Sequence, residues 1–396
     1  MSGVRAQRRV ARRESRRRRL RARRQAMVVV ASAVVVAGAA AGVMSALAGE
    51  GRRTTAAPDT SAPPTAAPLP AVPSATAAPR TPSAPASSAS RAPRPSNPAP
   101  SATRTTAPPA GGLLYRHPDS QVLDWVAAHP TDPRRPLIEA RIAARPAAVW
   151  FASYNPGAVT GQVRAVTSAA ARAGRTPVLV PYAIPGRDCG GASEGGAPDL
   201  AAYDGWIREF SAGLGDGPVI VILEPDSVAQ SDCLSADDLA ARNASLARAG
   251  RALHAANPKA KVYFDGGHSG WHPAAKQAAA LRAAGAASSG DGVFTNVSNF
   301  HRTADEAAYA RQVLAALGGP ERLGAVIDTS RNGNGAPAGD AWCDPTGRAL
   351  GRAPTTETGE ARIDAYLWVK LPGESDGCQG AAGSFSPDYA YALATG

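Results

Sequence analysis

The sequence lacks the glycine-rich signatures with which many α/β proteins bind nucleotides. None of its apolar, strand-like runs is followed by Gly-x-Gly-x-x-Gly or by Gly-x-x-x-x-Gly-Lys-Ser/Thr, so a nucleotide cofactor is not expected. Metal ligands are also scarce. His268 and His272 are four residues apart, but no third ligand is evident and the segment is expected to be a loop. We therefore expect a protein that works without a cofactor or a bound metal.

The main part of the chain also lacks the positive charge typical of nucleic-acid-binding proteins. Residues 1–25 contain twelve arginines and one glutamate, and their net charge of +11 equals the formal net charge of the whole chain. Residues 111–396 contain 25 basic and 29 acidic side chains, a net charge of −4. A mildly acidic domain is poorly suited to contact phosphate backbones. We expect no nucleic-acid partner.

Charge is absent from Gln25 to Gly49, directly after the arginine-rich tail. Residues 27–48 are mostly Val and Ala, and as a helix they would span about 33 Å, close to the thickness of a hydrocarbon core. The arginines predict that residues 1–26 stay in the cytoplasm and that the rest is exported. Ala46-Leu47-Ala48 resembles a signal-peptidase site. An uncleaved membrane anchor and a cleaved signal both stay open.

Residues 49–110 lack aromatic side chains and contain 15 of the 35 prolines, which predicts an extended linker. Residues 111–396 hold all six tryptophans and all four cysteines and are expected to form one catalytic domain. Cysteines in an exported domain favour two disulfides over free thiols. Of the three possible pairings we favour the local one, Cys189 with Cys233 and Cys343 with Cys378, because each bond would join two loops at strand ends.

Seven apolar runs predict strands, at residues 148–153, 178–183, 219–224, 261–265, 292–297, 325–329 and 365–371. Alanine-rich segments with helical spacing lie between most of them, at residues 158–173, 235–256, 273–284 and 303–317. Ser235 and the Thr303-x-x-Glu306 pair read as helix caps. This alternation predicts an α/β fold whose parallel sheet closes into a barrel. An open, doubly wound sheet is the competing architecture.

The run Val219–Leu223 is the clearest candidate for a strand buried on both faces. It ends in Glu224-Pro225-Asp226, and Pro225 cannot donate a hydrogen bond to the sheet. The two carboxyl groups are therefore expected in a loop at the carboxyl end of a parallel strand, where α/β enzymes usually place their chemistry.

Polar side chains follow six of the seven predicted strands and would share one rim of the sheet. They include Tyr182, Asp188, Asp226, Asp265, His268, Asn299, Asp328, Arg331, Lys370, Glu374 and Asp376. Trp150, Trp271 and Trp342 are near these loops in sequence, whereas Trp125, Trp206 and Trp368 are expected in the core. Carboxyl groups mixed with tryptophans suit a neutral ligand rich in hydroxyl groups, such as a sugar.

Four of these stretches resemble the marking sequences of glycoside hydrolase family 6, the cellulases. They are Tyr182-Ala-Ile-Pro-Gly-Arg-Asp-Cys189, Val221-Ile-Leu-Glu-Pro-Asp-Ser227, Asp265-Gly-Gly-His-Ser-Gly-Trp271 and Lys370-Leu-Pro-Gly-Glu-Ser-Asp-Gly-Cys378. The resemblance covers residues 111–396. It implies a distorted seven-stranded β/α barrel, the two local disulfides, and hydrolysis of β-1,4-glucan with inversion at the anomeric carbon.

The resemblance also implies roles for individual residues. Asp226 would be the general acid, Asp188 the carboxylate that raises the pKa of the acid and helps to handle the attacking water, Tyr182 the ring that distorts the scissile glucose, and Asp376 the proposed base. The water-holding serine corresponds to Ser193, or Glu194 takes its place. Sugar contacts are expected from Trp150, Asp265, His268, Trp271, Asn299, Trp342, Lys370 and Glu374.

We expect attack on internal bonds by a monomeric enzyme. Exo-acting relatives roof the cleft with two long loops, and only 34 residues lie between Cys343 and Cys378. An exo-acting cellobiohydrolase of the same family is nevertheless the main alternative. A non-catalytic glucan-binding protein would be expected to lack Asp226 or Asp188, and a purely structural barrel would not need the tryptophans.

Overall fold

The computed structural model describes residues 113–191, 193–339 and 341–396. The expected cytoplasmic tail, membrane segment and linker lie outside these residues. Within the described ranges, no helix is both long enough and apolar enough to cross a membrane.

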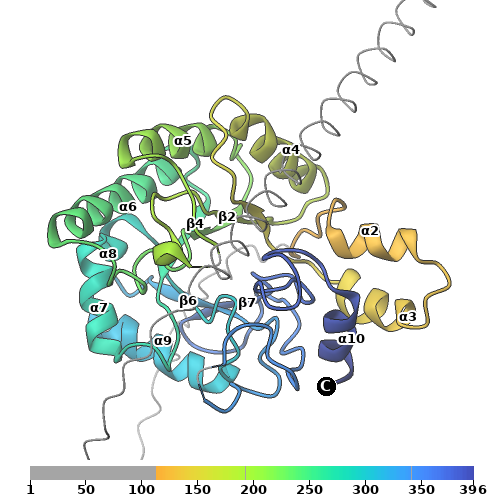
Figure 1. Ribbon diagram of the computed structural model, residues 1–396. Coiled ribbons are helices and arrows are strands. Elements are labelled where there is room, and N and C mark those ends of the chain that lie inside the picture. Colours follow the sequence, from red (N-terminus) through yellow and green to blue (C-terminus); the bar gives the residue numbers. More distant parts are fainter. Residues whose placement is uncertain (1–112, 192, 340) are drawn as a thin grey trace, which may run out of the picture. The chain divides into compact units, whose positions relative to one another are not determined.

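Seven parallel strands form one sheet in the order of the sequence, β1 to β7 (Figure 1). They are β1 (Val149–Phe151), β2 (Val178–Pro181), β3 (Val219–Leu223), β4 (Ala260–Asp265), β5 (Gly292–Thr295), β6 (Gly324–Asp328) and β7 (Ile363–Leu367). All seven predicted strands are confirmed, although several end earlier than predicted. The sheet curls until the chain beside its two edge strands meets. The Ala148 amide, just before β1, donates a hydrogen bond to the Trp368 carbonyl, just after β7, at 2.9 Å. This curled sheet is consistent with a distorted barrel.

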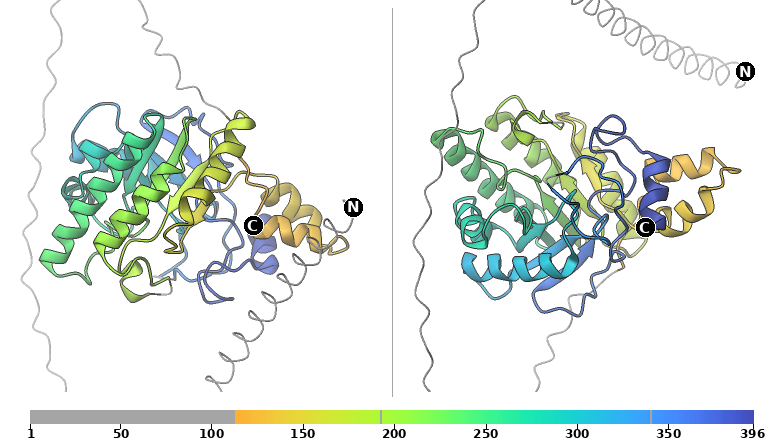
Figure 2. Two further views of the ribbon diagram at one scale, coloured as in Figure 1. Left: turned by 90° about the horizontal axis from the view of Figure 1, so that it is seen from above. Right: turned by 60° about the horizontal axis from the view of Figure 1, so that its bottom comes forward.

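Helices surround the curled sheet. They are α2 (Gln121–Ala128), α3 (Arg135–Ile138), the π-helical turn η1 (Glu139–Ala143), α4 (Val159–Arg172), the 3₁₀ turn η2 (Asp188–Gly190), α5 (Leu200–Ala212), α6 (Ala236–Ala256), α7 (Ala274–Ala283), α8 (Ala286–Ser289), α9 (Thr303–Leu317) and α10 (Pro387–Thr395). The predicted helices are confirmed as α4, α6, α7 and α9. Figure 2 shows that α2, α3 and α10 gather at one side of the ring, beside the carboxyl-terminal end of the chain.

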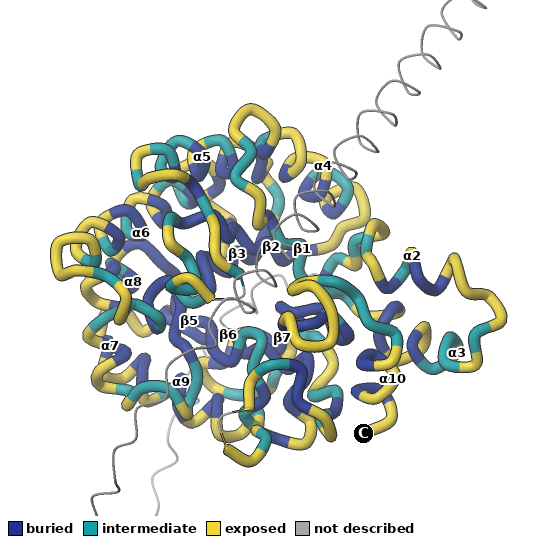
Figure 3. The backbone as a smooth tube through the Cα atoms, viewed as in Figure 1, coloured by how far each residue is buried: buried dark blue, intermediate teal, exposed yellow. Residues whose placement is uncertain are grey.

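Strand β3 is buried on both faces, as its apolar run predicts, and β2, β5 and β6 are also buried along their whole length. One face packs inside the curled sheet, where Ile220 and Ile222 meet Phe294 and Val326. The other face packs under the helices, where Val221 and Leu223 belong to a larger cluster with Phe210. Figure 3 shows that the strands near the centre are mostly buried, whereas exposed segments lie on the surrounding helices and on the loops. Trp125, Trp206 and Trp368 are buried, as expected.

One of the two predicted helix caps is wrong. Ser235 caps α6 and accepts a hydrogen bond from the Asp238 amide at 3.2 Å, which confirms that cap. Thr303 is instead the first residue of α9, and the residue before it makes no side-chain cap. Glu306 is fully buried and accepts a hydrogen bond from the Ser269 amide at 2.8 Å. Its carboxyl group therefore supports the loop after β4 rather than the end of its own helix.

Candidate active site

A cleft of about 1290 Å³ lies over the carboxyl ends of the strands. It brings together nearly all of the predicted site residues. Those that line it are Trp150, Tyr182, Asp188, Ser193, Asp226, His268, Trp271, Asn299, Trp342, Lys370, Glu374 and Asp376, with Glu194 beside them. Only Asp265, of the thirteen residues proposed from the sequence, is not part of the lining.

The two carboxyl groups after β3 have different surroundings. Glu224 is fully buried, and its oxygens accept hydrogen bonds from the amides of Ala183 at 2.9 Å and Ile184 at 3.0 Å. It therefore ties the end of β3 to the end of β2. Asp226, two residues later, lies in the cleft wall. Both residues have a positive φ, 48° and 70°, a backbone strain that is common at functional sites.

The pKa of Asp226 suits a general acid. Burial, the nearby Asp265 carboxylate and the Asp188 carboxylate raise the pKa of Asp226 to about 7. Tyr182 Oη donates a hydrogen bond to Asp226 Oδ2 at 3.2 Å. A carboxylic acid that keeps its proton near neutral pH can deliver it to a leaving group.

A chain of close polar contacts joins Asp226 to Asp188. The amide and the hydroxyl of Ser193 both donate to Asp188 Oδ2, at 2.8 and 2.9 Å. Ser193 Oγ also lies 3.1 Å from Tyr182 Oη, which contacts Asp226. The close turn requires glycine at position 191, because a Cβ there would lie 2.5 Å from Asp188 Oδ2. The structure thus places Ser193 between the two acids.

Arg187 holds this loop, although sequence reasoning did not select it as a site residue. Its side chain donates to the carbonyls of Ser193 and Ala152, both at 2.8 Å, and to the carbonyl of Tyr182. Its guanidinium also lies 4.4 Å from the centre of the Tyr182 ring. The Tyr182 ring also packs edge to face with the ring of Trp150, with centroids 5.3 Å apart.

The expected sugar contact of Asp265 is wrong. Asp265 is 2% exposed, and its carboxyl group accepts hydrogen bonds from the amides of Val228, Ala229 and Gly267 at 2.8–3.1 Å. Its oxygens are therefore used to hold the loop that follows Asp226. Asp265 acts on the cleft through its charge, which helps to raise the pKa of Asp226.

An aromatic wall lines the cleft beside the loop that follows Asp226. The rings of His268 and His301 stack with centroids 4.3 Å apart, and Trp271 lies 5.3 Å from His268. Burial and the neighbouring histidines lower the pKa of His268 to about 4. His272 contacts the Ala229 carbonyl through Nε2 at 2.9 Å. Because that contact requires a proton on Nε2, this nitrogen is not free to bind a metal.

Asp376 is held by two buried cations. Its Oδ2 accepts from Arg331 Nη1 at 2.8 Å and from the Asp344 amide at 3.0 Å, and its Oδ1 accepts from Lys370 Nζ at 2.8 Å. Arg331 is fully buried. The sequence showed Arg331 only as a residue after the sixth strand, because its partner lies 45 residues further along the chain.

Glu374 and Trp342 complete the lining near Asp376. Burial, opposed by Lys370 and Arg331, raises the pKa of Glu374 to about 7, and Gln121 of α2 donates to its Oε1 at 3.3 Å. Trp342 leaves 57% of its surface exposed, so the cleft is open to solvent at this wall.

The two local disulfides are confirmed, with Cα–Cα distances of 5.7 Å for Cys189–Cys233 and 5.8 Å for Cys343–Cys378. The first joins the loop that carries Asp188 to the segment after Asp226. The second joins the loop that carries Trp342 to the loop that carries Asp376.

The comparison with protein families decides the identity of this site. Residues 115–394 match the model of glycosyl hydrolases family 6. The chain belongs to this family. The carboxyl groups, the tyrosine and the tryptophans described above therefore lie in a family 6 cleft.

Several similar proteins are bacterial endoglucanases. Endoglucanase 1 of Streptomyces sp. (strain KSM-9) is 55% identical over 74% of this chain and 80% of the relative. Endoglucanase A of Thermobispora bispora is 52% identical over 71% of this chain and 61% of the relative. The endoglucanase Cel6 from Mycobacterium tuberculosis, solved in complex with methyl-cellobiosyl-4-deoxy-4-thio-beta-D-cellobioside, is 41% identical with a TM-score of 0.67, covering 73% of this chain and 99% of that structure.

Proposed function

We propose that this protein hydrolyses internal β-1,4-glucosidic bonds in cellulose or related β-glucans, with inversion at the anomeric carbon. The observation that carries the proposal is Asp226, a carboxyl group with a pKa of about 7 in a cleft lined by tryptophans. The endoglucanase names of its family 6 relatives support the same activity.

The first step of the proposed reaction is a proton transfer from Asp226. The glycosidic oxygen receives this proton as its bond to the anomeric carbon breaks, and the released chain leaves as an alcohol. We propose that Tyr182, which hydrogen-bonds Asp226, presses the ring of the scissile glucose out of its relaxed shape. Such a distortion brings the sugar closer to its oxocarbenium-like transition state.

Water attacks the anomeric carbon from the opposite face in the same step. We propose that Ser193 orients this water, because its hydroxyl is already bonded to Asp188 and lies beside Tyr182. The water must lose a proton, either toward Asp188 through Ser193 or to Asp376. Inverting enzymes leave room for such a water by separating their two carboxyl groups by about 6.5–9.5 Å.

The existing contacts of Asp376 limit where it can accept this proton. Both of its oxygens already accept hydrogen bonds from cations. Oδ2 also accepts a bond from the Asp344 amide, so a proton on Oδ2 would displace one of its two donors, whereas Oδ1 accepts one bond and has a lone pair left for a proton. We therefore propose that Asp376 acts through its charge as well as through any direct proton transfer.

The sugar chain would bind along the remaining lining residues. Trp150, Trp271 and Trp342 offer flat apolar faces on which pyranose rings can stack. His268, Asn299, Lys370 and Glu374 offer polar atoms that sugar hydroxyls can reach along the same cleft. We propose these residues as the substrate contacts, and no cofactor or metal takes part.

The open cleft favours attack on internal bonds. A polymer can enter sideways past the exposed Trp342, whereas an exo-acting enzyme would need a roof there. An exo-acting cellobiohydrolase of the same family is the alternative. We also propose that the domain is exported, either tethered through residues 27–48 or released after cleavage near Ala48, and that it acts as a monomer.

Proton NMR of the fresh products tests the mechanism. The chain is mixed with cellopentaose, and the first anomeric signals are followed before mutarotation. Single displacement by water predicts that the α-anomer appears first. If the β-anomer appears first, a covalent intermediate forms and the proposed mechanism is wrong. If no product forms from any β-glucan, the proposed activity itself is wrong.

A further inference from the structure

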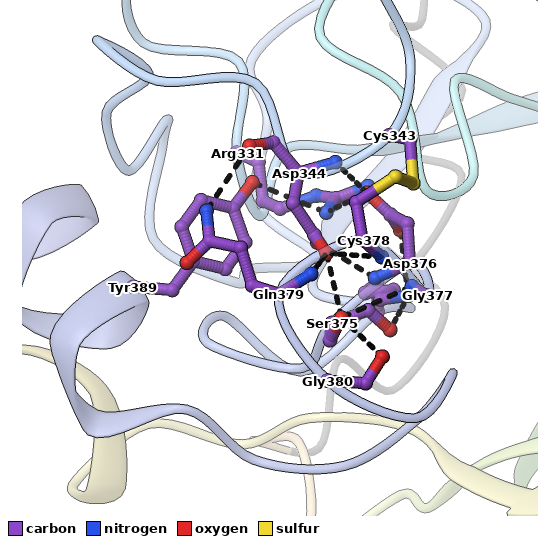
Figure 4. The surroundings of a disulfide bond; sticks show 11 residues. Arg331, Cys343, Asp344, Ser375, Asp376, Gly377, Cys378, Gln379, Gly380 and Tyr389 are labelled. Carbon is purple, nitrogen blue, oxygen red and sulfur yellow. Dashed lines mark hydrogen bonds and ion pairs between the residues drawn. A yellow bond between two sulfur atoms is a disulfide. The ribbon is translucent and has the colours of Figure 1, made fainter.

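Asp344 lies behind the cleft, directly after Cys343, and contacts the loop that carries Asp376. It is only 4% exposed and has a φ of 45°. Figure 4 shows its carboxyl group at the centre of residues 375–379, with the Cys343–Cys378 disulfide beside it. Asp344 lies outside the four family-like motifs, so the sequence did not predict a role for it.

Four hydrogen bonds converge on the Asp344 side chain. Oδ2 accepts from Ser375 Oγ at 2.6 Å and from the amides of Cys378 and Gln379 at 3.0 and 2.8 Å. Oδ1 accepts from the amide of Asp376 at 2.6 Å. One carboxyl group therefore fixes the backbone of the loop on both sides of Asp376.

The contact between the two aspartates is reciprocal. The Asp376 amide donates to the Asp344 side chain, and the Asp344 amide donates to Asp376 Oδ2 at 3.0 Å. Asp344 thus holds both the main chain and the carboxyl group of Asp376. The other bonds to the Asp376 carboxyl group come from Arg331 and Lys370, so its orientation depends on three neighbours.

Asp344 is suited to this task because it remains ionised. Burial opposes its charge, but the bonds from Ser375 and from the amides of Asp376, Gln379 and Cys378 outweigh burial and lower its pKa. A carboxylate that accepts several hydrogen bonds is a strong and well-aimed acceptor.

We propose that Asp344 is a positioning residue for the reaction, which sets the orientation of Asp376 in the cleft. The proposal rests on the proposed function. A purely structural link between the two loops is already supplied by the Cys343–Cys378 disulfide. The four bonds to the Asp344 carboxyl group fix the loop around Asp376. They thereby set where the Asp376 side chain begins, and the Asp344 amide bonds its carboxyl group directly, which a disulfide does not provide.

A double-mutant cycle tests this role. Asp344→Ala, Asp376→Ala and the double variant are compared with the wild-type chain on carboxymethylcellulose. If Asp344 acts through Asp376, Asp344→Ala lowers kcat about 10²-fold, as a misplaced reacting group does, while KM changes little. The double variant is then no slower than Asp376→Ala alone. Losses that multiply in the double variant would show that Asp344 acts independently of Asp376 and would overturn the proposal.

Asp291 provides the matched control. It is another buried aspartate, at the opposite end of the sheet, bonded to His254, Lys261 and Arg322. Asp291→Ala is expected to lower the melting temperature and leave kcat unchanged. If it lowers kcat as much as Asp344→Ala does, the loss at Asp344 reflects general destabilisation, and the proposal is wrong.

A crystal structure gives a second test that does not depend on activity. Asp344→Asn keeps the shape of the side chain but places an NH₂ group against the hydrogen-bond donors of residues 375–379. This variant replaces Asp344→Ala in the experiment if the alanine variant does not fold. We expect the Asp376 carboxyl group to leave Arg331 or Lys370 in either variant. An unmoved Asp376 would overturn the proposal, whatever the rate. The wild-type rate itself reports on the proposed function, so the two failures can be distinguished.

Discussion

At the scale of single residues, the proposed chemistry depends on one carboxyl group that is kept protonated. Burial is the main reason for the raised pKa of Asp226, and the charges of Asp265 and Asp188 add to it. Asp265 takes no part in the lining but is held near Asp226 by three backbone amides. The pKa of Asp226, which follows β3, is therefore raised by residues at the ends of the two neighbouring strands, β2 and β4.

Asp226→Ala is expected to remove nearly all activity on cellulose, a loss of about 10²- to 10⁴-fold, because the departing oxygen then receives no proton. An aryl cellobioside with an acidic phenol as leaving group needs little protonation, so the variant should retain much of its rate there. Initial rates on the two substrates check this. Equal losses on both would show that Asp226 is not the acid.

The charge of Asp188 should be visible in the pH dependence. Because the acid must carry its proton, kcat/KM of the wild-type chain is expected to fall as the pH rises through about 7, the pKa of Asp226. Asp188→Asn removes a negative charge that raises this pKa, so the alkaline limb should move to lower pH. Profiles of kcat/KM measure the shift.

Glu194 supplies the control for this shift, since it lines the cleft in the same loop as Asp188 but is not among the main causes of the raised pKa. Glu194→Gln should leave the alkaline limb nearly in place. A limb that stays fixed in Asp188→Asn, or that moves to higher pH, would contradict the electrostatic account.

Residue types near the motifs could be found from the sequence, but the direction of each side chain could not. Asp226 and Asp265 both follow buried strands, yet one faces the cleft and the other faces backbone amides. The contact of Arg331 with Asp376 and the role of Asp344 were not predicted, because the partners lie 45 and 32 residues away in the chain. Such contacts leave no local pattern in the sequence.

At the scale of the elements, apolar runs predicted the strands well because most strand residues are buried, and β2, β3, β5 and β6 are buried along their whole length. The helices α2, α5 and α10 were not predicted. Leu200–Ala212 has an apolar face that is buried. The side chain of Asp199 caps this helix by accepting a hydrogen bond from the Ala202 amide at 2.8 Å, and this cap is the sequence feature that could have predicted the helix. The Thr303 cap failed because tertiary packing draws Glu306 to Ser269.

The first residue of β5, Gly292, lies very close to the backbone of the neighbouring strand β6. Gly292 has a φ of 154°, and a Cβ there would lie 1.8 Å from the Gly324 carbonyl oxygen. Gly292→Ala is therefore expected to lower the free energy of unfolding by about 3 kcal/mol, through backbone strain together with a clash. Urea denaturation measures the loss.

Gly157→Ala is the matched control, because this glycine also has a positive φ, 80°, but has nothing within 4 Å of the added Cβ. It should lose only about 1 kcal/mol from strain. Equal losses in the two variants would contradict the argument from the clash.

At the scale of the whole domain, two disulfides fix the loops that form the cleft. Cys189–Cys233 links the segments around Asp188 and Asp226, and Cys343–Cys378 links those around Trp342 and Asp376. The acids thus sit on loops held at both ends, while the wall at Trp342 stays open to solvent. The sequence predicted this pairing and the cleft, because cysteines and acids cluster at strand ends.

The most direct test of the account compares viscosity with reducing ends during hydrolysis of carboxymethylcellulose. An open cleft binds a chain at its middle, so each early cut should shorten the polymer strongly. The account predicts a steep early fall in viscosity when few reducing ends have formed. Release of cellobiose with almost unchanged viscosity would contradict it, because such products require attack from a chain end.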